Sequence, residues 1–190
     1  RQAGYQVVKS SFSHKQESAK PGYYAVHLKD FDIWAELTTT IRCGLHRYTF
    51  PQAENAMIKF DLGFQQNWDR TSECLFKKIN DSIFIGYRFS KGWASNQKMF
   101  FAIQLSRKVK NFKIYADSVL NESKEVTAKD LKACLQFDTK QGEKILMKVG
   151  LSSADLEGAI ESLNDISDWN FERVKNEAAS IWERELRKIQ

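Results

Sequence analysis

The chain has 190 residues, a length that suits one domain or one domain with a small appendage. Hydrophobic residues make up 42% of the chain and charged residues 28%, a balance that excludes a disordered tail and allows a sizeable core. The formal net charge of +5 is small, and the basic residues form no patch that could bind phosphates, so we expect no nucleic-acid partner. No apolar run of about 18 residues occurs, which predicts that no segment spans a membrane.

Neither the beginning of the chain nor its cysteines decide the cellular compartment. The segment Arg1–Tyr5 lacks the apolar core of a signal peptide, and a trimmed mature protein or an excised fragment would begin in the same way. The cysteines, Cys43, Cys74 and Cys134, are odd in number and too far apart for a zinc knuckle. Each falls in an apolar or alternating run, so we expect three buried free thiols.

The first 150 residues predict one β-strand after another. Segment 33–42 alternates, with Ile33, Leu37 and Ile41 on a core-facing side and polar residues such as Glu36 on the other. The predicted strands are 22–28, 33–42, 45–50, 56–62, 79–90, 98–106, 112–115, 131–137 and 144–150. No helical pattern separates them, and some strands are apolar throughout. We therefore expect a mainly β protein, an antiparallel β-sandwich rather than a parallel sheet.

Two amphipathic helices are predicted after Leu151. Ser152 followed by Asp155 matches the [ST]-x-x-[DE] pattern, which predicts that the Ser152 hydroxyl caps the first helix. The second helix is predicted from about Asn170 to Ile189, and its apolar residues recur at helical spacing. The stripe consists of Phe171, Val174, Ala178, Ile181, Trp182, Leu186 and Ile189. It must be buried, and two interpretations stay open: the helix packs back on the sheet, or it leads into a further domain.

The histidines offer no metal pair at helical spacing. His27 lies inside a predicted strand, where a partnered structural histidine is the default, and His46 begins another. His14 with Glu17 is compatible with acid–base chemistry, but such a pair more often orders a loop.

The sequence marks no catalytic carboxyl pair. A glycosidase needs two carboxyl groups facing each other across the scissile bond, and spacing along a sandwich cannot establish that arrangement. We expect Glu36, Asp61, Asp69 and Asp81 in turns or on solvent-facing sides of strands.

Trp93 stands in a Gly/Ser/Asn turn, Lys91–Asn96, that does not need a large aromatic ring. Three interpretations remain: a platform for a sugar, an anchor at an interface, or a ring folded back on the sheet.

Five stretches together resemble a known family. They are Phe12–Tyr24 with its Pro-Gly-Tyr-Tyr string, Ala35–Thr40, Ile41–Pro51 with His-Arg-Tyr-Thr-Phe-Pro, Gly92–Gln97, and Val149–Ser153. The stretches occur in the family's order and cover nearly the whole chain. They are similar to the N-terminal β-sandwich domain of glycoside hydrolase family 92, the bacterial exo-α-mannosidases.

The resemblance implies a larger, two-domain parent enzyme. Residues 1–151 would be the β-sandwich, and residues 152–190 a helical linker towards an (α/α)6-barrel. Members of the family hydrolyse terminal α-mannosides of mannose-containing glycans with inversion and depend on calcium. Their general acid Glu, general base Asp and calcium belong to the barrel, so no catalytic or metal-binding residue maps onto this chain. A periplasmic or cell-surface location follows from the resemblance as well.

The resemblance also implies that the chain lacks the family's early segment and the barrel, so we expect these 190 residues alone to be inactive. Trp93 then becomes a cleft or domain-interface residue, and Trp182 and Trp169 become candidates for domain contact. Two other functions are kept open: a free-standing carbohydrate-binding module, and a structural domain that docks a partner through the stripe of its last helix.

Overall fold

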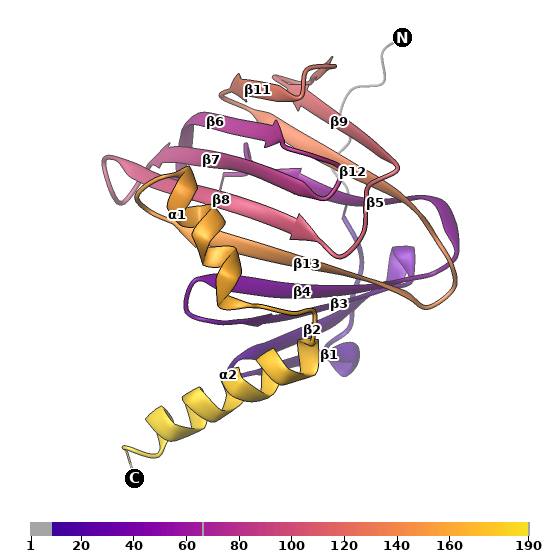
Figure 1. Ribbon diagram of the computed structural model, residues 1–190, viewed down its shortest axis with the longest axis vertical. Coiled ribbons are helices and arrows are strands. Elements are labelled where there is room, and N and C mark those ends of the chain that lie inside the picture. Colours follow the sequence, from indigo (N-terminus) through magenta and orange to yellow (C-terminus); the bar gives the residue numbers. More distant parts are fainter. Residues whose placement is uncertain (1–8, 66, 190) are drawn as a thin grey trace.

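The computed structural model describes residues 9–65 and 67–189. In the described residues a nine-stranded sheet and a four-stranded sheet pack face to face (Figure 1), and every strand pair is antiparallel. The large sheet has the order β1(Glu17–Lys20), β2(Tyr23–Leu28), β3(Ile33–Thr39), β4(Cys43–Phe50), β13(Glu143–Ser152), β8(Gln97–Leu105), β7(Ile83–Lys91), β6(Arg70–Lys78) and β11(Glu125–Ala128). The small sheet has the order β10(Val119–Asn121), β9(Asn111–Ala116), β12(Leu131–Thr139) and β5(Ala53–Asp61). The expected antiparallel β-sandwich is confirmed.

Two tight turns show why the strands pair as they do. Pro21 and Gly22 join β1 to β2, and Gly22 has a φ of +77°, which suits a turn with proline first and glycine second. Gly142, with a φ of +72°, closes the turn between β12 and β13. Glycine adopts this left-handed backbone without a steric penalty, so each turn can reverse the chain.

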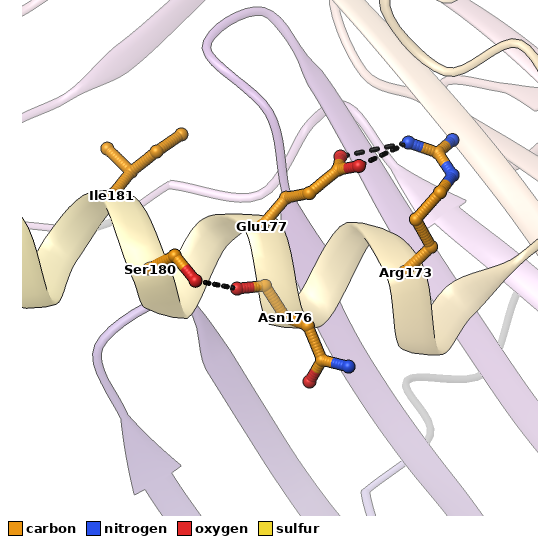
Figure 2. A pocket seen from close by; sticks show the side chains of 5 residues that line it. All are labelled: Arg173, Asn176, Glu177, Ser180 and Ile181. Carbon is orange, nitrogen blue, oxygen red and sulfur yellow. Dashed lines mark hydrogen bonds and ion pairs between the residues drawn. The ribbon is translucent and has the colours of Figure 1, made fainter.

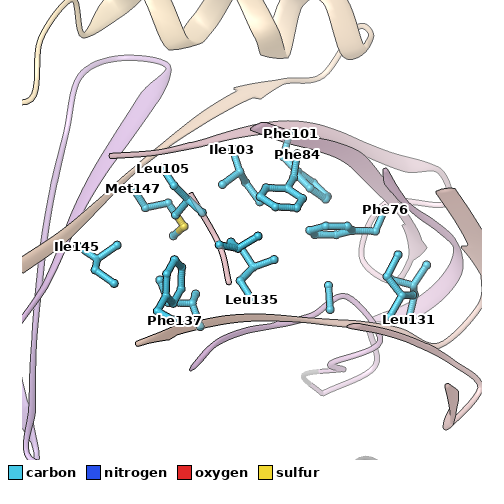
Figure 3. Close-up of a cluster of buried hydrophobic side chains, with 14 of the residues drawn as sticks. Phe76, Phe84, Phe101, Ile103, Leu105, Leu131, Leu135, Phe137, Ile145 and Met147 are labelled. Atoms are coloured by element: carbon cyan, nitrogen blue, oxygen red, sulfur yellow. The ribbon is translucent and has the colours of Figure 1, made fainter. Parts of the chain in front are cut away.

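The main core lies between the two sheets (Figure 3). Phe76, Phe84 and Phe101 come from the large sheet, and Leu135 and Phe137 from the small one. These side chains are buried, and the rings of Phe76 and Phe84 have centroids 5.8 Å apart. Burial of such side chains contributes about 1.5–3 kcal/mol each, so this layer dominates the stability of the fold.

A second core covers the opposite face of the large sheet. Figure 1 shows α1(Leu156–Ser162) lying across β8 and β13, with α2(Phe171–Leu186) across β2 to β4. Their buried residues, among them Ala159, Phe171 and Val174, pack on Leu45 and Ala102 of the sheet. The large sheet is therefore covered on both faces, which explains why some of its strands are apolar throughout.

The first half of α2 is held by an ion-pair cluster beneath it. Arg47 donates two hydrogen bonds of 2.6 Å to the carboxylate of Glu36, and its Nη1 lies 2.8 Å from Glu172 of the helix. The guanidinium also stacks over Phe171, 4.1 Å from the ring centroid. The hydroxyl of Tyr23 donates to Glu36 at 2.9 Å. This cluster fixes the direction in which the helix leaves the sandwich.

The structure corrects the expected course of segment 33–42. The strand ends at Thr39, and Ile41, expected on the core side, is 93% exposed in the following turn. A hydrogen bond from the Thr40 amide to the Cys43 carbonyl closes that turn and takes Ile41 out of the sheet. Glu36 is not solvent-facing either, because α2 covers its side of the strand.

The cap of the first helix also differs from the prediction. Asp155, and not Ser152, caps α1, because its carboxylate accepts from the Gly158 amide at 2.7 Å. The Ser152 hydroxyl instead accepts from the amide of Ala154 at 3.1 Å and so shapes the turn before the helix. Both residues serve helix entry, but in positions shifted along the chain.

Candidate functional site

Parts of each segment that carries the family resemblance meet at one end of the large sheet. There β3 ends, β4 begins, β7 turns into β8, and β13 ends, as the pairings of Thr39 with Gly44 and of Gly150 with Cys43 require. We call this end, formed by residues 39–44, 62–69 (apart from 66), 91–97 and 151–155, the loop end. The turns within the family stretches at 39–44, 91–97 and 151–153 therefore share one surface.

A pocket of about 390 Å³ opens at the loop end, and we call it the His46 pocket. Its apolar rim consists of Ile41, Met99 and Leu151, which are all exposed. Its wall is lined by polar residues and one glycine, namely Thr39, Arg42, Gly44, His46, Ser152 and Ser153. Exposed apolar residues that gather next to polar groups are typical of a surface that another domain covers.

The floor of the His46 pocket is held by a half-buried pair. Nδ1 of His46 lies 2.8 Å from the hydroxyl of Tyr48 on the same face of β4. Burial lowers the pKa of His46 to about 4 and raises the pKa of Tyr48 to about 12. Both side chains are therefore neutral near pH 7. His46 was expected at the start of a strand, but it lies within β4, and its role in a pocket was not predicted.

Trp93 lies beside this pocket, fully in solvent. Its side chain is 92% exposed, and it borders a shallow depression of about 630 Å³ together with Asn96, Gln97 and Ser153. A ring folded back on the sheet is therefore wrong for this residue. The exposed ring beside two amide side chains is compatible with a sugar contact and with an interface anchor.

A second exposed tryptophan, Trp68, stacks on Trp93. The ring centroids are 6.4 Å apart and the planes are inclined by 30°. Sequence reasoning missed Trp68, although its position between Asn67 and Asp69, two turn-forming residue types, is the same kind of signal that singled out Trp93. The two rings together extend the apolar surface of the loop end.

Arg88 of β7 positions the segment that carries Trp68. Its Nε donates to the Leu62 carbonyl at 3.0 Å, and its Nη2 donates to the Phe64 carbonyl at 3.0 Å. It also forms an ion pair with Asp69, which lowers the pKa of that carboxyl group. Asp69 is thus a structural anchor and not merely a turn residue.

The apolar surface continues from the loop end onto α2. A groove of about 300 Å³ runs between the β3–β4 turn and the helix, with Ile41 on one side and Ile181 on the other. Trp182 and Leu186 further along the helix are about half-exposed. The stripe of the last helix is therefore buried on the sheet up to Ala178, as the first interpretation expected, and exposed beyond it.

A neighbouring depression on α2 has no feature of an active site (Figure 2). Arg173 and Glu177 form an ion pair at 2.9 Å along its wall, and the Ser180 hydroxyl donates to the Asn176 carbonyl at 2.9 Å. These groups satisfy one another, which is the usual arrangement on a solvated helix face.

The other predicted acid–base residues lie away from the loop end. His14 and Glu17 do interact, at 2.6 Å, and Tyr24 donates to the second oxygen of Glu17. Hydrogen bonds from Tyr24 and His14 lower the pKa of Glu17. The group lies where β1 begins, at the end of that strand remote from the loop end. It orders the entry into the sheet.

The remaining candidates have structural partners. His27 has its Nε2 2.9 Å from Asp32 and stacks on Trp34, which confirms a partnered structural histidine. Asp81 is ion-paired with Lys78 at 2.8 Å in a turn, and Asp61 lies 3.7 Å from Lys132.

Among residues 9–65 and 67–189 no three His, Cys, Asp or Glu side chains come together to hold a metal ion. The cysteines are buried and free, as expected, and burial raises the pKa of Cys43 to about 11 and of Cys74 to about 12. Such thiols are poor nucleophiles near pH 7. None of the described helices has the length and apolar character needed to cross a membrane.

Comparisons with known proteins identify the class of this domain. The chain is similar to the family GH92 α-mannosidase BT3965 from Bacteroides thetaiotaomicron, with 32% identity, a TM-score of 0.89, and coverage of 94% of this chain and 25% of that one. The inverting mannosidase BT2199 from Bacteroides thetaiotaomicron VPI-5482 shares the fold at 23% identity, with a TM-score of 0.78 and coverage of 92% and 23%. A bacterial glucoamylase shares it more distantly, at 10% identity, a TM-score of 0.54 and coverage of 85% and 26%. The fold is thus one found in glycoside hydrolases.

The family itself follows from the sequence match. Residues 1–152 match the Glycosyl hydrolase family 92 N-terminal domain, and the chain belongs to that family. A search of curated proteins found no match. The chain spans about a quarter of the length of the family 92 structures that it matches.

Proposed function

We propose that the chain is the non-catalytic N-terminal domain of a longer α-mannosidase and that its loop end docks the catalytic domain. The exposed apolar surface carries this proposal: Ile41, Trp93 and Trp68 stand in solvent at the end of the sheet where the family stretches converge. Open apolar surface of this extent, next to polar groups, is typical of a domain interface. The half-open stripe of α2 extends the surface in the direction in which the chain continues as a linker.

The partner would be an (α/α)6-barrel in the same protein, with residues 1–151 as the sandwich and 152–190 as the linker. The barrel would hold the general acid Glu, the general base Asp and the calcium of an inverting exo-α-mannosidase that acts on mannose-containing glycans. The sandwich would form one wall of the cleft, with Trp93 at its edge. A periplasmic or cell-surface location is part of the same proposal. Support comes from the family membership and from the α-mannosidases among the similar structures.

An activity assay tests whether catalysis belongs to the barrel and not to this domain. The 190-residue chain should release no mannose from an α-mannobioside, with or without calcium, whereas the full-length protein should release it in a calcium-dependent way. Release by the chain alone would contradict the proposal. A thermal shift of the chain on addition of calcium would contradict the placement of the metal in the barrel.

Surface variants test the docking. In the full-length protein Ile41→Asp places a charge in the proposed interface and should separate the unfolding of the two domains in calorimetry. The matched control is Ile79→Asp, an exposed isoleucine near the opposite ends of β6 and β7. Equal effects of both variants would argue against docking at the loop end.

A carbohydrate-binding module is the second candidate, favoured by the position of Trp93 beside Asn96 and Gln97. It predicts saturable binding of mannose or mannobiose in calorimetry, lost in Trp93→Ala but kept in Trp34→Ala on the helix-covered face of the sheet. A flat titration of the wild-type chain would exclude this function for these sugars.

A further inference from the structure

The floor of the His46 pocket presents an N–H group that lacks a partner. Among the described residues the only hydrogen bond of the Tyr48 hydroxyl is with Nδ1 of His46. Tyr48 is half-buried, and a hydroxyl that only accepted there would leave its own proton without a protein partner, at a cost in free energy; the pairing therefore favours Tyr48 as donor and Nδ1 as acceptor. The imidazole proton of neutral His46 is therefore on Nε2.

Nε2 faces the open part of the pocket. A Cβ on Gly44 would lie 3.4 Å from it, so the absence of a side chain at Gly44 leaves free space beside this atom. No hydrogen-bond partner of Nε2 is found among the described residues, although its residue lines the pocket. Since burial lowers the pKa of His46 to about 4, Nε2 is a neutral donor near pH 7.

Arg42 is a second polar residue that lines the same pocket. Its Nη2 is ion-paired with Asp165 at 2.8 Å, and because the side chain is 57% exposed and guanidinium carries five N–H groups, it keeps donors for a partner. The rim of Ile41, Met99 and Leu151 would exclude water once another domain covers it. A donor enclosed in this way needs an acceptor from the covering partner.

We infer that the His46 pocket receives a carboxylate side chain of the docked catalytic domain, which accepts from Nε2 of His46 and from Arg42. The inference rests on the proposed function and adds the chemistry of the contact. An ionised carboxylate offers two acceptor oxygens and no donor, and its hydrogen bonds to N–H groups are stronger than those of a neutral hydroxyl or amide oxygen. The charge of Arg42 favours an anion over a neutral carbonyl.

A crystal structure of the full-length protein tests the contact directly. A carboxylate oxygen of the catalytic domain is expected within hydrogen-bond distance of Nε2. An apolar side chain, a hydroxyl or a trapped water in the pocket would overturn the inference while leaving docking intact. A loop end that stays in solvent would overturn the proposed function as well, so the two failures are distinguishable.

A titration gives an independent readout. The pKa of His46, followed by NMR of histidine-labelled protein, should be about 4 in the 190-residue chain and higher in the full-length protein, because a nearby carboxylate favours the imidazolium. An unchanged or lowered pKa of His46 would overturn the inference.

Discussion

Gly22 and Ala178 meet where α2 crosses the β1–β2 turn. A Cβ on Gly22 would lie 2.9 Å from the Cβ of Ala178 and 3.1 Å from its carbonyl carbon. Gly22 also has a left-handed φ of +77°. The helix can approach the sheet this closely only because the turn carries no side chain at that position.

The substitution Gly22→Ala should therefore loosen α2. The left-handed backbone costs about 1 kcal/mol for alanine, and the clash with the helix adds to it, so we expect a loss of about 2–4 kcal/mol in the free energy of unfolding. Urea denaturation measures this loss. Proteolysis should cut α2 earlier in the variant than in the wild type, because the helix is no longer held.

The matched control is Gly142→Ala. Gly142 has a similar φ of +72°, but no atom lies within 4 Å of the position of its Cβ. The Gly142→Ala variant should lose only the cost of the left-handed backbone, about 1 kcal/mol of the free energy of unfolding, and α2 should stay protected from proteolysis. Equal losses in both variants would mean that the contact with Ala178 does not matter.

Removal of Arg47 should leave the Glu36 carboxylate under α2 without its cationic partner. Burial alone would raise the pKa of Glu36, but hydrogen bonds from Arg47 and Tyr23 outweigh it and keep the pKa below its ordinary value of 4.5. In Arg47→Met the ionised Glu36 keeps only Tyr23, so we expect a loss of about 2–3 kcal/mol at pH 7. The double variant with Glu36→Leu should recover most of it, because no charge remains to be compensated.

The pH dependence of this effect has a defined sign. A depressed carboxyl pKa contributes stability that is present above pH 4.5 and is lost as the pH falls through the pKa of the folded state. The gap in unfolding free energy between wild type and Arg47→Met should therefore narrow below pH 4. Urea midpoints at pH 7 and pH 3 measure it, and a constant gap would show that Arg47 acts through packing alone.

A strand can be predicted from the sequence where its own residues form an apolar or alternating pattern. A strand that forms because of its pairing with neighbouring strands cannot be predicted in this way. Strands β4 and β13 are close to their predicted ranges because their apolar runs are unbroken or alternate. Strand β6 was missed because its first residues, Arg70–Glu73, are polar, and its pairing with β7 and β11 is a tertiary contact. Ile41 was misplaced because an alternating pattern continues past the residue at which the chain turns.

The candidate site is predictable only in part for the same reason. Trp93 stands out because an aromatic residue in a turn has no local purpose. The role of His46 depends on the register that puts Tyr48 and Gly44 on its face of β4, and the position of Trp68 depends on Arg88 of another strand. Neither of these tertiary contacts can be predicted from a single sequence.

His46 should make the fold sensitive to mild acid. Burial lowers the pKa of His46 in the folded state from 6.5 to about 4, so the unfolded chain binds the proton first as the pH falls. The neutral imidazole therefore contributes its whole share to the free energy of unfolding above pH 6.5. This share is lost progressively as the pH falls to 4, and amounts to about 3 kcal/mol.

The variant His46→Gln isolates that contribution. It keeps a polar side chain that can accept from Tyr48 but does not titrate, so its unfolding free energy should change less between pH 7 and pH 4 than that of the wild type. Subtraction of the two curves removes the carboxylates that both share. If the curves run parallel, His46 is not held neutral by the fold.

Arg88 should control the stack of Trp68 on Trp93. Arg88→Met removes the donors to the Leu62 and Phe64 carbonyls and the ion pair with Asp69, so the segment that carries Trp68 loses its anchor on β7. We expect a loss of about 1–3 kcal/mol in stability, and a loss of the exciton signal that two stacked indoles give in circular dichroism. Trp68→Ala should abolish the same signal with little change in stability, because the ring is 61% exposed.

The control is Arg107→Met, which breaks an ion pair with Glu143 near the turn that Gly142 closes and should keep the signal. Retention of the signal in Arg88→Met would show that the two rings hold each other without the arginine.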